Sequence, residues 1–186
     1  MRLFIAIEIP AAIRDALTAF IQELRGIAPH VKWVRGENLH VTLKFLGHTD
    51  PAQLPEVERS LGTIRNARPV TLDFSGVGFF PNERRPRVFW AGMNASANLG
   101  ELAKDVDRQM QPLGFPLENR PFTPHLTLAR FEPPGLPAKL AASIKQNTSR
   151  RFGGLTASDF HLIESKLKPT GAEYTTLKSF PFLLET

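Results

Sequence analysis

Cysteine is absent from this chain of 186 residues, and its absence limits the chemistry available to it. Without thiols there is no disulfide, no thiolate metal site and no cysteine nucleophile. No apolar run approaches the roughly 18 residues that a membrane-spanning helix needs. The apolar N-terminal stretch is interrupted by Glu8 and Pro10, which argues against a signal peptide. We therefore expect a cytoplasmic protein without a membrane partner.

Acidic side chains are fewer than basic ones. The chain has 18 Asp and Glu against 23 Lys and Arg, a net charge of +5. This balance favours a polyanionic partner such as nucleic acid, although a generally basic protein would have it too. A composition that is 42% hydrophobic and 22% charged is typical of a globular protein rather than a disordered one.

Apolar spacing predicts helices and strands that do not alternate regularly. The predicted helices cover residues 10–26, a stretch that opens at Asp50-Pro51, residues 97–113 and a short segment around Leu140 and Ile144. The predicted strands cover 3–7, 31–34, 39–46, 70–80, 87–93, the segment at His125, 155–165 and 173–180. This mixture predicts an α+β fold with antiparallel sheets. No linker separates independent parts, so we expect residues 1–186 to form a single domain.

One tetrapeptide occurs twice. His40-Val41-Thr42-Leu43 returns 85 residues later as His125-Leu126-Thr127-Leu128, and both copies lie in β-rich surroundings. Side chains alternate between the faces of a strand, so the histidine and threonine of each copy share a face. The repeat predicts two lobes with related layouts that present two imidazoles and two hydroxyls to one cleft.

Two imidazoles beside one cleft suit phosphodiester chemistry. Histidine titrates near pH 6.5, so one ring can accept a proton while its protonated partner donates one. Each such transfer is worth roughly 10²–10⁴-fold in rate. Threonine hydroxyls can donate hydrogen bonds to phosphate oxygens, where charge grows in the transition state.

The motif has two alternatives to a catalytic role. A single His-x-Thr is more often a buried histidine bonded to a carbonyl, but two matching copies favour catalysis. A zinc site is the second alternative. Neither copy has an acidic or cysteine ligand at a suitable spacing, so a zinc ion would lack its third ligand. We therefore expect neither a metal site nor a cofactor.

The residues around both copies resemble the 2H phosphoesterase superfamily. The stretches that carry the resemblance are Leu39–Gly47, Phe122–Arg130, Arg2–Ala6 and Glu164–Tyr174. Together they are similar to the RNA 2′,3′-cyclic phosphodiesterase branch, whose members are also known as 2′-5′ RNA ligases. The resemblance implies a bilobal, pseudo-symmetric fold in which two antiparallel sheets, flanked by helices, surround a central cleft. Two intertwined lobes would each contribute one His-x-Thr-x motif.

The resemblance also implies a reaction and roles for the motif residues. The protein would be a metal-independent hydrolase that opens a terminal 2′,3′-cyclic phosphate of RNA to a 2′-phosphomonoester. His125 would be the proton acceptor that activates water, and His40 the proton donor to the departing O3′, although the two motifs alone do not distinguish these roles. Thr42 and Thr127 would bind the phosphate. RNA ends, including those of tRNA halves, would be the partners of a monomer.

Phe45 and Arg130 each stand five residues after a motif histidine. Strict alternation puts each on the opposite face from its histidine, where core packing or a surface salt bridge would explain it. In relatives these positions resemble a pair that sandwiches the terminal nucleobase, an interaction worth about 1–3 kcal/mol per stacked base. Both roles stay open, because stacking requires the strands to twist or end at the cleft.

The sequence is also compatible with several alternatives. The same residues would serve a reversible 2′-5′ RNA ligase, the fold could be a non-catalytic RNA-binding module, and a metallohydrolase is a third option. Arg84, Arg85 and Arg87 cluster at a predicted hairpin tip, which is either solvated or an RNA-backbone contact. Trp33 and Trp90 are expected in the core, and Tyr174 is a candidate cleft residue.

Overall fold

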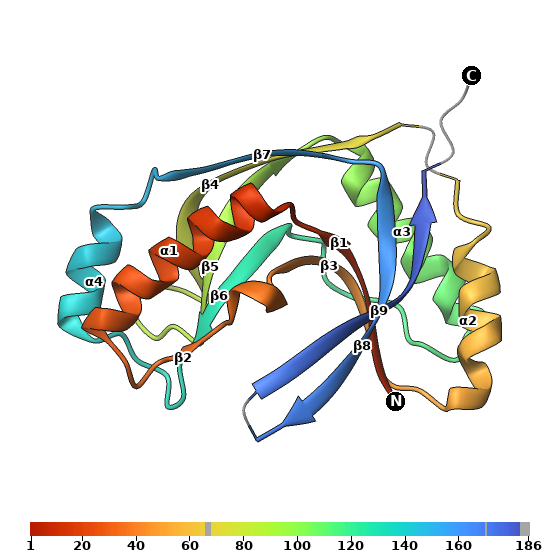
Figure 1. Ribbon diagram of the computed structural model, residues 1–186, viewed down its shortest axis with the longest axis horizontal. Coiled ribbons are helices and arrows are strands. Elements are labelled where there is room, and N and C mark those ends of the chain that lie inside the picture. The colour runs from red at the N-terminus through yellow and green to blue at the C-terminus, as the bar shows by residue number, and fades with distance from the viewer. Residues whose placement is uncertain (66–67, 170, 183–186) are drawn as a thin grey trace.

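Two antiparallel sheets form most of the computed structural model, which describes residues 1–65, 68–169 and 171–182 (Figure 1). Sheet A has the order β3-β1-β8-β9 and consists of β1 (Arg2–Glu8), β3 (His40–His48), β8 (Asp159–Lys168) and β9 (Gly171–Pro181). Sheet B has the order β2-β6-β5-β4-β7 and consists of β2 (Lys32–Trp33), β4 (Val70–Phe80), β5 (Val88–Ala95), β6 (His125–Arg130) and β7 (Arg151–Ala157). The predicted α+β class with antiparallel sheets is confirmed.

Helices lie at the outer sides of the sheets. They are α1 (Ala11–Ile27), α2 (Leu54–Leu61), α3 (Asn98–Met110) and α4 (Ala138–Lys145), with short 3₁₀ turns η1 (Gly36–Asn38), η2 (Pro51–Gln53) and η3 (Gln111–Leu113). None of the described helices has the length and apolar character needed to cross a membrane.

The two sheets repeat one layout. The motif strands β3 and β6 pair with β1 and β5, and each of these two strands is followed by a helix, α1 or α3. The order β3-β1-β8-β9 in sheet A therefore corresponds to β6-β5-β4-β7 in sheet B, which β2 extends at one edge. The pseudo-symmetry expected from the repeated tetrapeptide is present in the strand order itself.

The helices cross between the two halves. α1 follows β1 of sheet A but packs on sheet B, where the ring of Phe20 lies 6.3 Å from Phe89 and 5.4 Å from Phe152. α3 follows β5 of sheet B but contacts β3 and α2 on the side of sheet A (Figure 1). Each sheet is thus covered by a helix that the other half supplies. We propose that the chain is one domain of two intertwined lobes.

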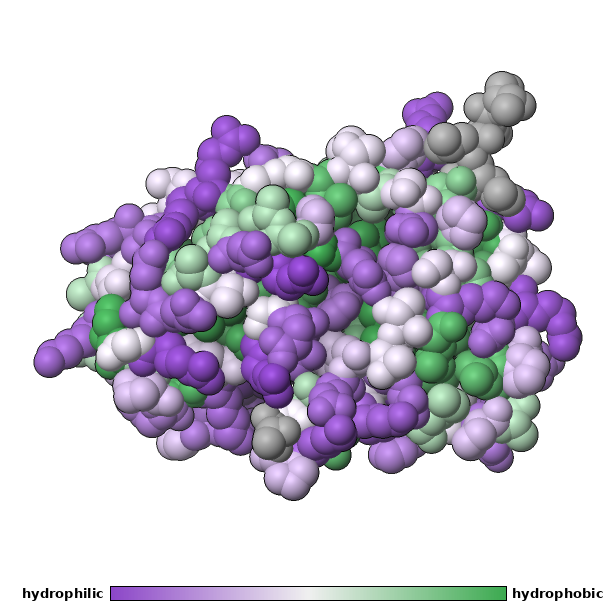
Figure 2. Space-filling model, viewed as in Figure 1, coloured by the Kyte–Doolittle hydropathy of each residue, from purple (hydrophilic) through white to green (hydrophobic). Residues whose placement is uncertain are grey.

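A continuous core explains why these elements form. The buried residues of α1 recur at helical spacing, and they are Ile13, Leu17, Phe20, Ile21 and Leu24. They belong to a single apolar cluster that includes strands of both sheets. Full burial of a side chain such as Phe20 is worth roughly 1.5–3 kcal/mol. The face seen in Figure 2 is largely hydrophilic, with scattered apolar patches between polar side chains.

A β-bulge interrupts each motif strand at the same point. In β3, Leu43 is an extra residue between two successive pairs with β1, and in β6 Leu128 is the extra residue between two pairs with β5. Both strands then share one exposure pattern over six residues: partly exposed, buried, partly exposed, buried, buried, exposed. One extra residue reverses the alternation of the side chains that follow it, and in β3 this reversal holds up to Phe45, after which a second irregularity occurs.

The bulges overturn the expectation from strict alternation for Phe45 and Arg130. In sheet A, Thr42 pairs with Ala6 and Phe45 pairs with Phe4, two positions away on the same face of β1. In sheet B, Thr127 and Arg130 likewise pair with Trp90 and Val88, which share a face of β5. Each fifth residue therefore lies on the same face as its motif. We call these surfaces, with His40 and Thr42 on sheet A and His125 and Thr127 on sheet B, the motif faces.

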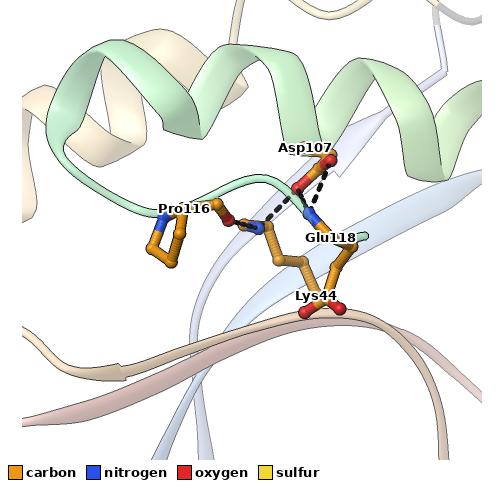
Figure 3. Close-up of polar contacts among 4 residues, drawn as sticks. All are labelled: Lys44, Asp107, Pro116 and Glu118. Atoms are coloured by element: carbon orange, nitrogen blue, oxygen red, sulfur yellow. Dashed lines mark hydrogen bonds and ion pairs between the residues drawn. The ribbon is translucent and has the colours of Figure 1, made fainter. Parts of the chain in front are cut away.

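The bulge in β3 also turns Lys44 away from the motif face into a buried polar network (Figure 3). Its side chain is 2% exposed and ion-pairs with Asp107 of α3, and its Nζ donates to the carbonyl of Pro116 at 2.7 Å. The Asp107 carboxylate also accepts the backbone N–H of Glu118 at 3.1 Å. One ammonium group thus joins β3, α3 and the segment that leads to His125. The corresponding residue of β6 is the buried Ala129.

We predict that Lys44→Met destabilises the protein by on the order of 3 kcal/mol, because it leaves the Asp107 carboxylate without its buried partner. Lys44→Met combined with Asp107→Asn should regain much of this loss, since the amide oxygen can still accept from Glu118. Urea denaturation measures both. The matched control is Lys178→Met, whose pair with Glu58 is solvent-exposed and worth at most about 1 kcal/mol. Equal losses at Lys44 and Lys178 would contradict the prediction.

Candidate active site

The two motif histidines begin the two strands that meet between the sheets. His40 is the first residue of β3 and His125 the first residue of β6, and these strands contact each other. The chain also passes directly from one sheet to the other, because the N–H of Val34 donates to Leu128 O at 2.8 Å only six residues before His40. The structure thus brings the two sequence motifs together from the two halves of the fold.

His125 is held in a defined orientation. Its Nδ1 lies 2.8 Å from the carbonyl oxygen of Thr123. A carbonyl only accepts hydrogen bonds, so Nδ1 carries the proton and the neutral ring has its lone pair on Nε2. The ring also lies edge-on to Phe80, with centroids 5.0 Å apart and planes at 85°. Nε2 is therefore the atom of His125 suited to take up a proton.

His40 lies in a corresponding aromatic setting on sheet A. Its ring centroid is 6.0 Å from Phe4 of β1 and 5.6 Å from Tyr174 of β9. The ring centroids of Phe4 and Tyr174 lie 4.9 Å apart, so both rings lie beside the imidazole on the motif face of sheet A. Tyr174, a candidate from the sequence, lies beside His40 in the structure. Phe4 and Phe80 were not foreseen as neighbours of the histidines, because their alternation alone does not show which face they share.

Burial lowers the pKa of His40 below its usual value, and this is the largest influence on it. The Asn38 carbonyl and the Glu8 carboxylate oppose the shift, while His161 and Arg14 add to it. Nδ1 of His40 forms no hydrogen bond within the described part of the chain. The Asn38 carbonyl therefore raises the pKa of the ring from nearby without forming a hydrogen bond of regular geometry. In the free protein His40 is consequently neutral at neutral pH.

Glu8 distinguishes the surroundings of the two histidines. It pairs directly with His40 across β1 and β3, and its Oε1 accepts a hydrogen bond from Thr176 Oγ1 at 2.5 Å. The residue that pairs with His125 is Gly92, which has no side chain to offer. Sequence reasoning treated Glu8 only as an interruption of an apolar stretch. A carboxylate at the end of an otherwise buried strand was the sequence signal that could have identified Glu8 as a site residue.

Thr42 and Thr127 lie two residues beyond the histidines on the motif faces. Both are partly exposed, and within the described part of the chain neither hydroxyl is in a side-chain hydrogen bond. Each follows its histidine at the spacing that places both side chains on one face of a strand. The hydroxyls can therefore donate to an anion that the imidazoles flank.

Phe45 and Arg130 extend the two motif faces. Phe45 is 65% exposed, unusual for a phenylalanine, and its ring lies 5.9 Å from Phe4. Arg130 is exposed and close enough to Tyr174 of sheet A to lower its pKa, although burial has the larger effect and raises that pKa overall. Among the described residues no carboxylate forms an ion pair with Arg130, and the neighbouring Glu132 pairs with Lys32. Core packing therefore does not explain the position of Phe45, and a salt bridge does not explain that of Arg130.

The two tryptophans have different environments. Trp33 is 7% exposed and lies in the core, as expected. Trp90 is only partly buried and pairs with Thr127 on the motif face of sheet B, so its assignment to the core was wrong. A Cβ at Gly78 would lie 2.3 Å from the indole, which shows that glycine is needed there for the ring to lie flat across β4.

Other polar groups lie outside this arrangement. His161 is buried, with Nδ1 3.0 Å from Ser179 Oγ and Nε2 3.4 Å from Asp159. Within residues 1–65, 68–169 and 171–182 no three His, Cys, Asp or Glu side chains are grouped as metal ligands. A shallow hollow at the β4–β7 edge, beside Asp73 and Arg151, contains none of the motif residues and has no convergent catalytic groups.

Comparisons with known proteins match most of this chain. The family model described as LigT like Phosphoesterase matches residues 7–90 and 93–174, which include both motifs. An RNA 2′,3′-cyclic phosphodiesterase of Archaeoglobus fulgidus is 36% identical and covers 97% of this chain and 99% of its own length. One of Methanothermobacter thermautotrophicus is 33% identical, with coverages of 97% and 98%.

Solved structures of related proteins have the same fold over nearly the whole chain. TT0787 of Thermus thermophilus superposes with a TM-score of 0.81 at 32% identity over 100% of both chains. E. coli LigT complexed with 3′-AMP superposes with a TM-score of 0.75 at 30% identity over 97% of both chains. The chain therefore belongs to the LigT-like phosphoesterase family of the 2H phosphoesterase superfamily, as its paired motifs predicted, and is a phosphodiesterase.

Proposed function

We propose that the protein is an RNA 2′,3′-cyclic phosphodiesterase that opens a terminal cyclic phosphate to a 2′-phosphomonoester, with tRNA halves among its substrates. The observation that carries the proposal is the pair of bulged strands β3 and β6, which contact each other and present one histidine and one threonine each. The names of the relatives from Archaeoglobus and Methanothermobacter support the substrate class.

The reaction needs only groups that the chain itself provides. His125 Nε2 takes a proton from water, whose oxygen forms a bond to phosphorus while the P–O3′ bond breaks. His40 gives its proton to O3′, which leaves a free 3′-hydroxyl and a 2′-phosphate. Thr42 and Thr127 donate to the non-bridging oxygens as their negative charge grows. With the 5′-hydroxyl of another RNA in place of water, the same groups would form a 2′-5′ linkage.

His40 must be protonated before it can donate. Its burial disfavours the imidazolium, whereas Glu8 and the anionic phosphate of a bound substrate favour it. His125 has no such carboxylate opposite it, since its partner in the ladder is Gly92. Although burial lowers the pKa of His40 overall, Glu8 places a carboxylate opposite this ring, and on this ground we assign His40 as the proton donor and His125 as the proton acceptor.

The terminal nucleobase would lie between Phe45 and Arg130. An aromatic face and a guanidinium plane stack on any base without reading its hydrogen-bonding edge. The exposure of both side chains on the motif faces supports this role.

We predict that His40→Ala and His125→Ala each lower kcat for a 2′,3′-cyclic nucleotide by roughly 10²–10⁴-fold, because each removes one proton transfer. His48→Ala, at the exposed end of β3, is the matched control and should retain full activity. Chromatography identifies the product, which should be the 2′-phosphate, and excess chelator should leave the rate unchanged. Hydrolysis at the normal rate by either variant, or a 3′-phosphate product, would contradict the proposal.

We predict that Glu8→Gln moves the alkaline limb of the pH–rate profile to lower pH. The Glu8 charge raises the pKa of His40, so its removal lowers that pKa, and a proton donor loses activity as pH rises through its pKa. Glu37→Gln, which removes an exposed carboxylate, is the control. The limbs report the coupled pair of histidines, so the shift is read as a difference between variants. A shift of the acid limb instead would assign His40 as the proton acceptor.

We predict that Phe45→Ala and Arg130→Ala raise KM for 2′,3′-cyclic nucleotides by about 5-fold or more, as expected when stacking on one face of the base is removed. Phe45→Tyr keeps an aromatic face and should behave like the unchanged protein. Ribose 2′,3′-cyclic phosphate has no base, so the variants should hydrolyse it as well as the unchanged protein does. Equal losses on both substrates would place these residues at the phosphate rather than at the base.

A further inference from the structure

The tip of the β4–β5 hairpin, residues 81–87, carries arginines that the reaction at the cyclic phosphate does not use. Arg84, Arg85 and Arg87 are all exposed. β5 places Val88 on the motif face, opposite Arg130, so alternation turns Arg87 to the other side of the sheet. Arg84 and Arg85 lie in the turn itself, beyond the end of the β ladder.

The tip has a defined backbone. The N–H of Arg87 donates to Phe80 O at 2.8 Å and closes the turn, and Arg87 O accepts from Phe131 N at 2.9 Å. Within the turn, Asn82 Oδ1 accepts the N–H groups of Arg84 and Arg85 at 3.0 and 3.2 Å. The two arginines are therefore presented from a hydrogen-bonded turn, which reduces the ordering cost of a ligand contact.

The tip begins beside the candidate active site. Phe80, the last residue of β4, has its ring 5.0 Å from that of His125. Arg84 follows four residues later, so its Cα lies within about 14 Å of the Phe80 Cα. A long arginine side chain extends that reach. An RNA strand held at His125 by its terminal phosphate would pass within reach of this turn.

Arg84 and Arg85 differ in charge balance from several other basic residues around the site, although Arg130 likewise has no ion-pair partner among the described residues. Among the described residues, neither Arg84 nor Arg85 forms an ion pair with a carboxylate. Other basic residues on neighbouring turns and strands do form such pairs, namely Lys32–Glu132, Arg35–Glu37, Lys166–Glu164 and Lys168–Glu173. The tip thus offers two guanidinium groups whose charge no described protein partner neutralises.

We propose that Arg84 and Arg85 bind the phosphodiester backbone of the RNA, a few nucleotides from its cyclic phosphate end. Guanidinium groups match phosphate oxygens in geometry and charge without reading the base sequence. The site then prefers oligoribonucleotide ends to free cyclic mononucleotides. This inference rests on the proposed function and names the part of the substrate that the motif residues do not touch.

The test compares two substrates, adenosine 2′,3′-cyclic phosphate and an eight-nucleotide RNA that ends in the cyclic phosphate. Arg84→Ala/Arg85→Ala should lower kcat/KM for the RNA by about 2- to 5-fold for each arginine, the weight of an exposed ion pair. The slope of log kcat/KM against log salt for the RNA should become shallower by about 0.7 for each phosphate that is no longer bound. Hydrolysis of the mononucleotide should not change, whereas a general loss of structure would affect both substrates.

Two control variants each remove one arginine elsewhere, so their effect is compared with the effect expected for each of Arg84 and Arg85. Arg87→Ala lies on the same hairpin but faces the other side, and Arg59→Ala lies on α2, away from the motif faces. Both should keep the RNA rate and its salt dependence. An equal fall in the Arg87 variant, or an unchanged RNA rate in the Arg84/Arg85 variant, would overturn the inference and leave the proposed function intact. If the unchanged protein hydrolyses neither substrate, the proposed function itself fails.

Discussion

The candidate site depends on one extra residue in each motif strand. Side chains alternate with a period of two, so the bulges at Leu43 and Leu128 reverse the alternation halfway along β3 and β6. Histidine, threonine and the fifth residue then share one face, which regular strands would not allow. The same reversal turns Lys44 to the back of sheet A, where its ion pair with Asp107 joins the strand of His40 to α3 and the approach to His125. One backbone irregularity thus arranges the site and anchors it.

The two halves repeat the same layout around the site, and the places where they differ distinguish the surroundings of His40 from those of His125. Strand order, bulge position and the aromatic neighbour of each histidine are repeated. Glu8 faces His40, however, while Gly92 faces His125. An acid–base pair needs two similar groups that differ in their readiness to hold a proton, and such a difference arises from neighbours rather than from the histidines themselves. The crossing of α1 and α3 keeps the two halves in one core, so that neither motif is positioned by its own half alone.

Much of the fold could be predicted because the signals are local. The apolar stripe of α1 and the alternating strands depend on residues close in sequence, and the repeated tetrapeptide marks two related strands wherever they lie. Phe45 and Arg130 were placed on the wrong face because a bulge has no signature in residue type at Leu43 or Leu128. Trp90 was assigned to the core because an aromatic residue in a strand fits either face, and only the glycine at position 78 lets its ring lie on the motif face.

By itself, the sequence determined the α+β class, the two motifs, the family and the residue types available for chemistry, since these depend on composition, short-range periodicity and local motifs. The tertiary structure alone decided which side chains share a surface. It brought Glu8 opposite His40, placed that imidazole beside Phe4 and Tyr174, and set the bulges that direct Phe45 and Arg130. The physical reason is that register and burial arise from pairing between strands far apart in the chain, and no short stretch of sequence contains both partners.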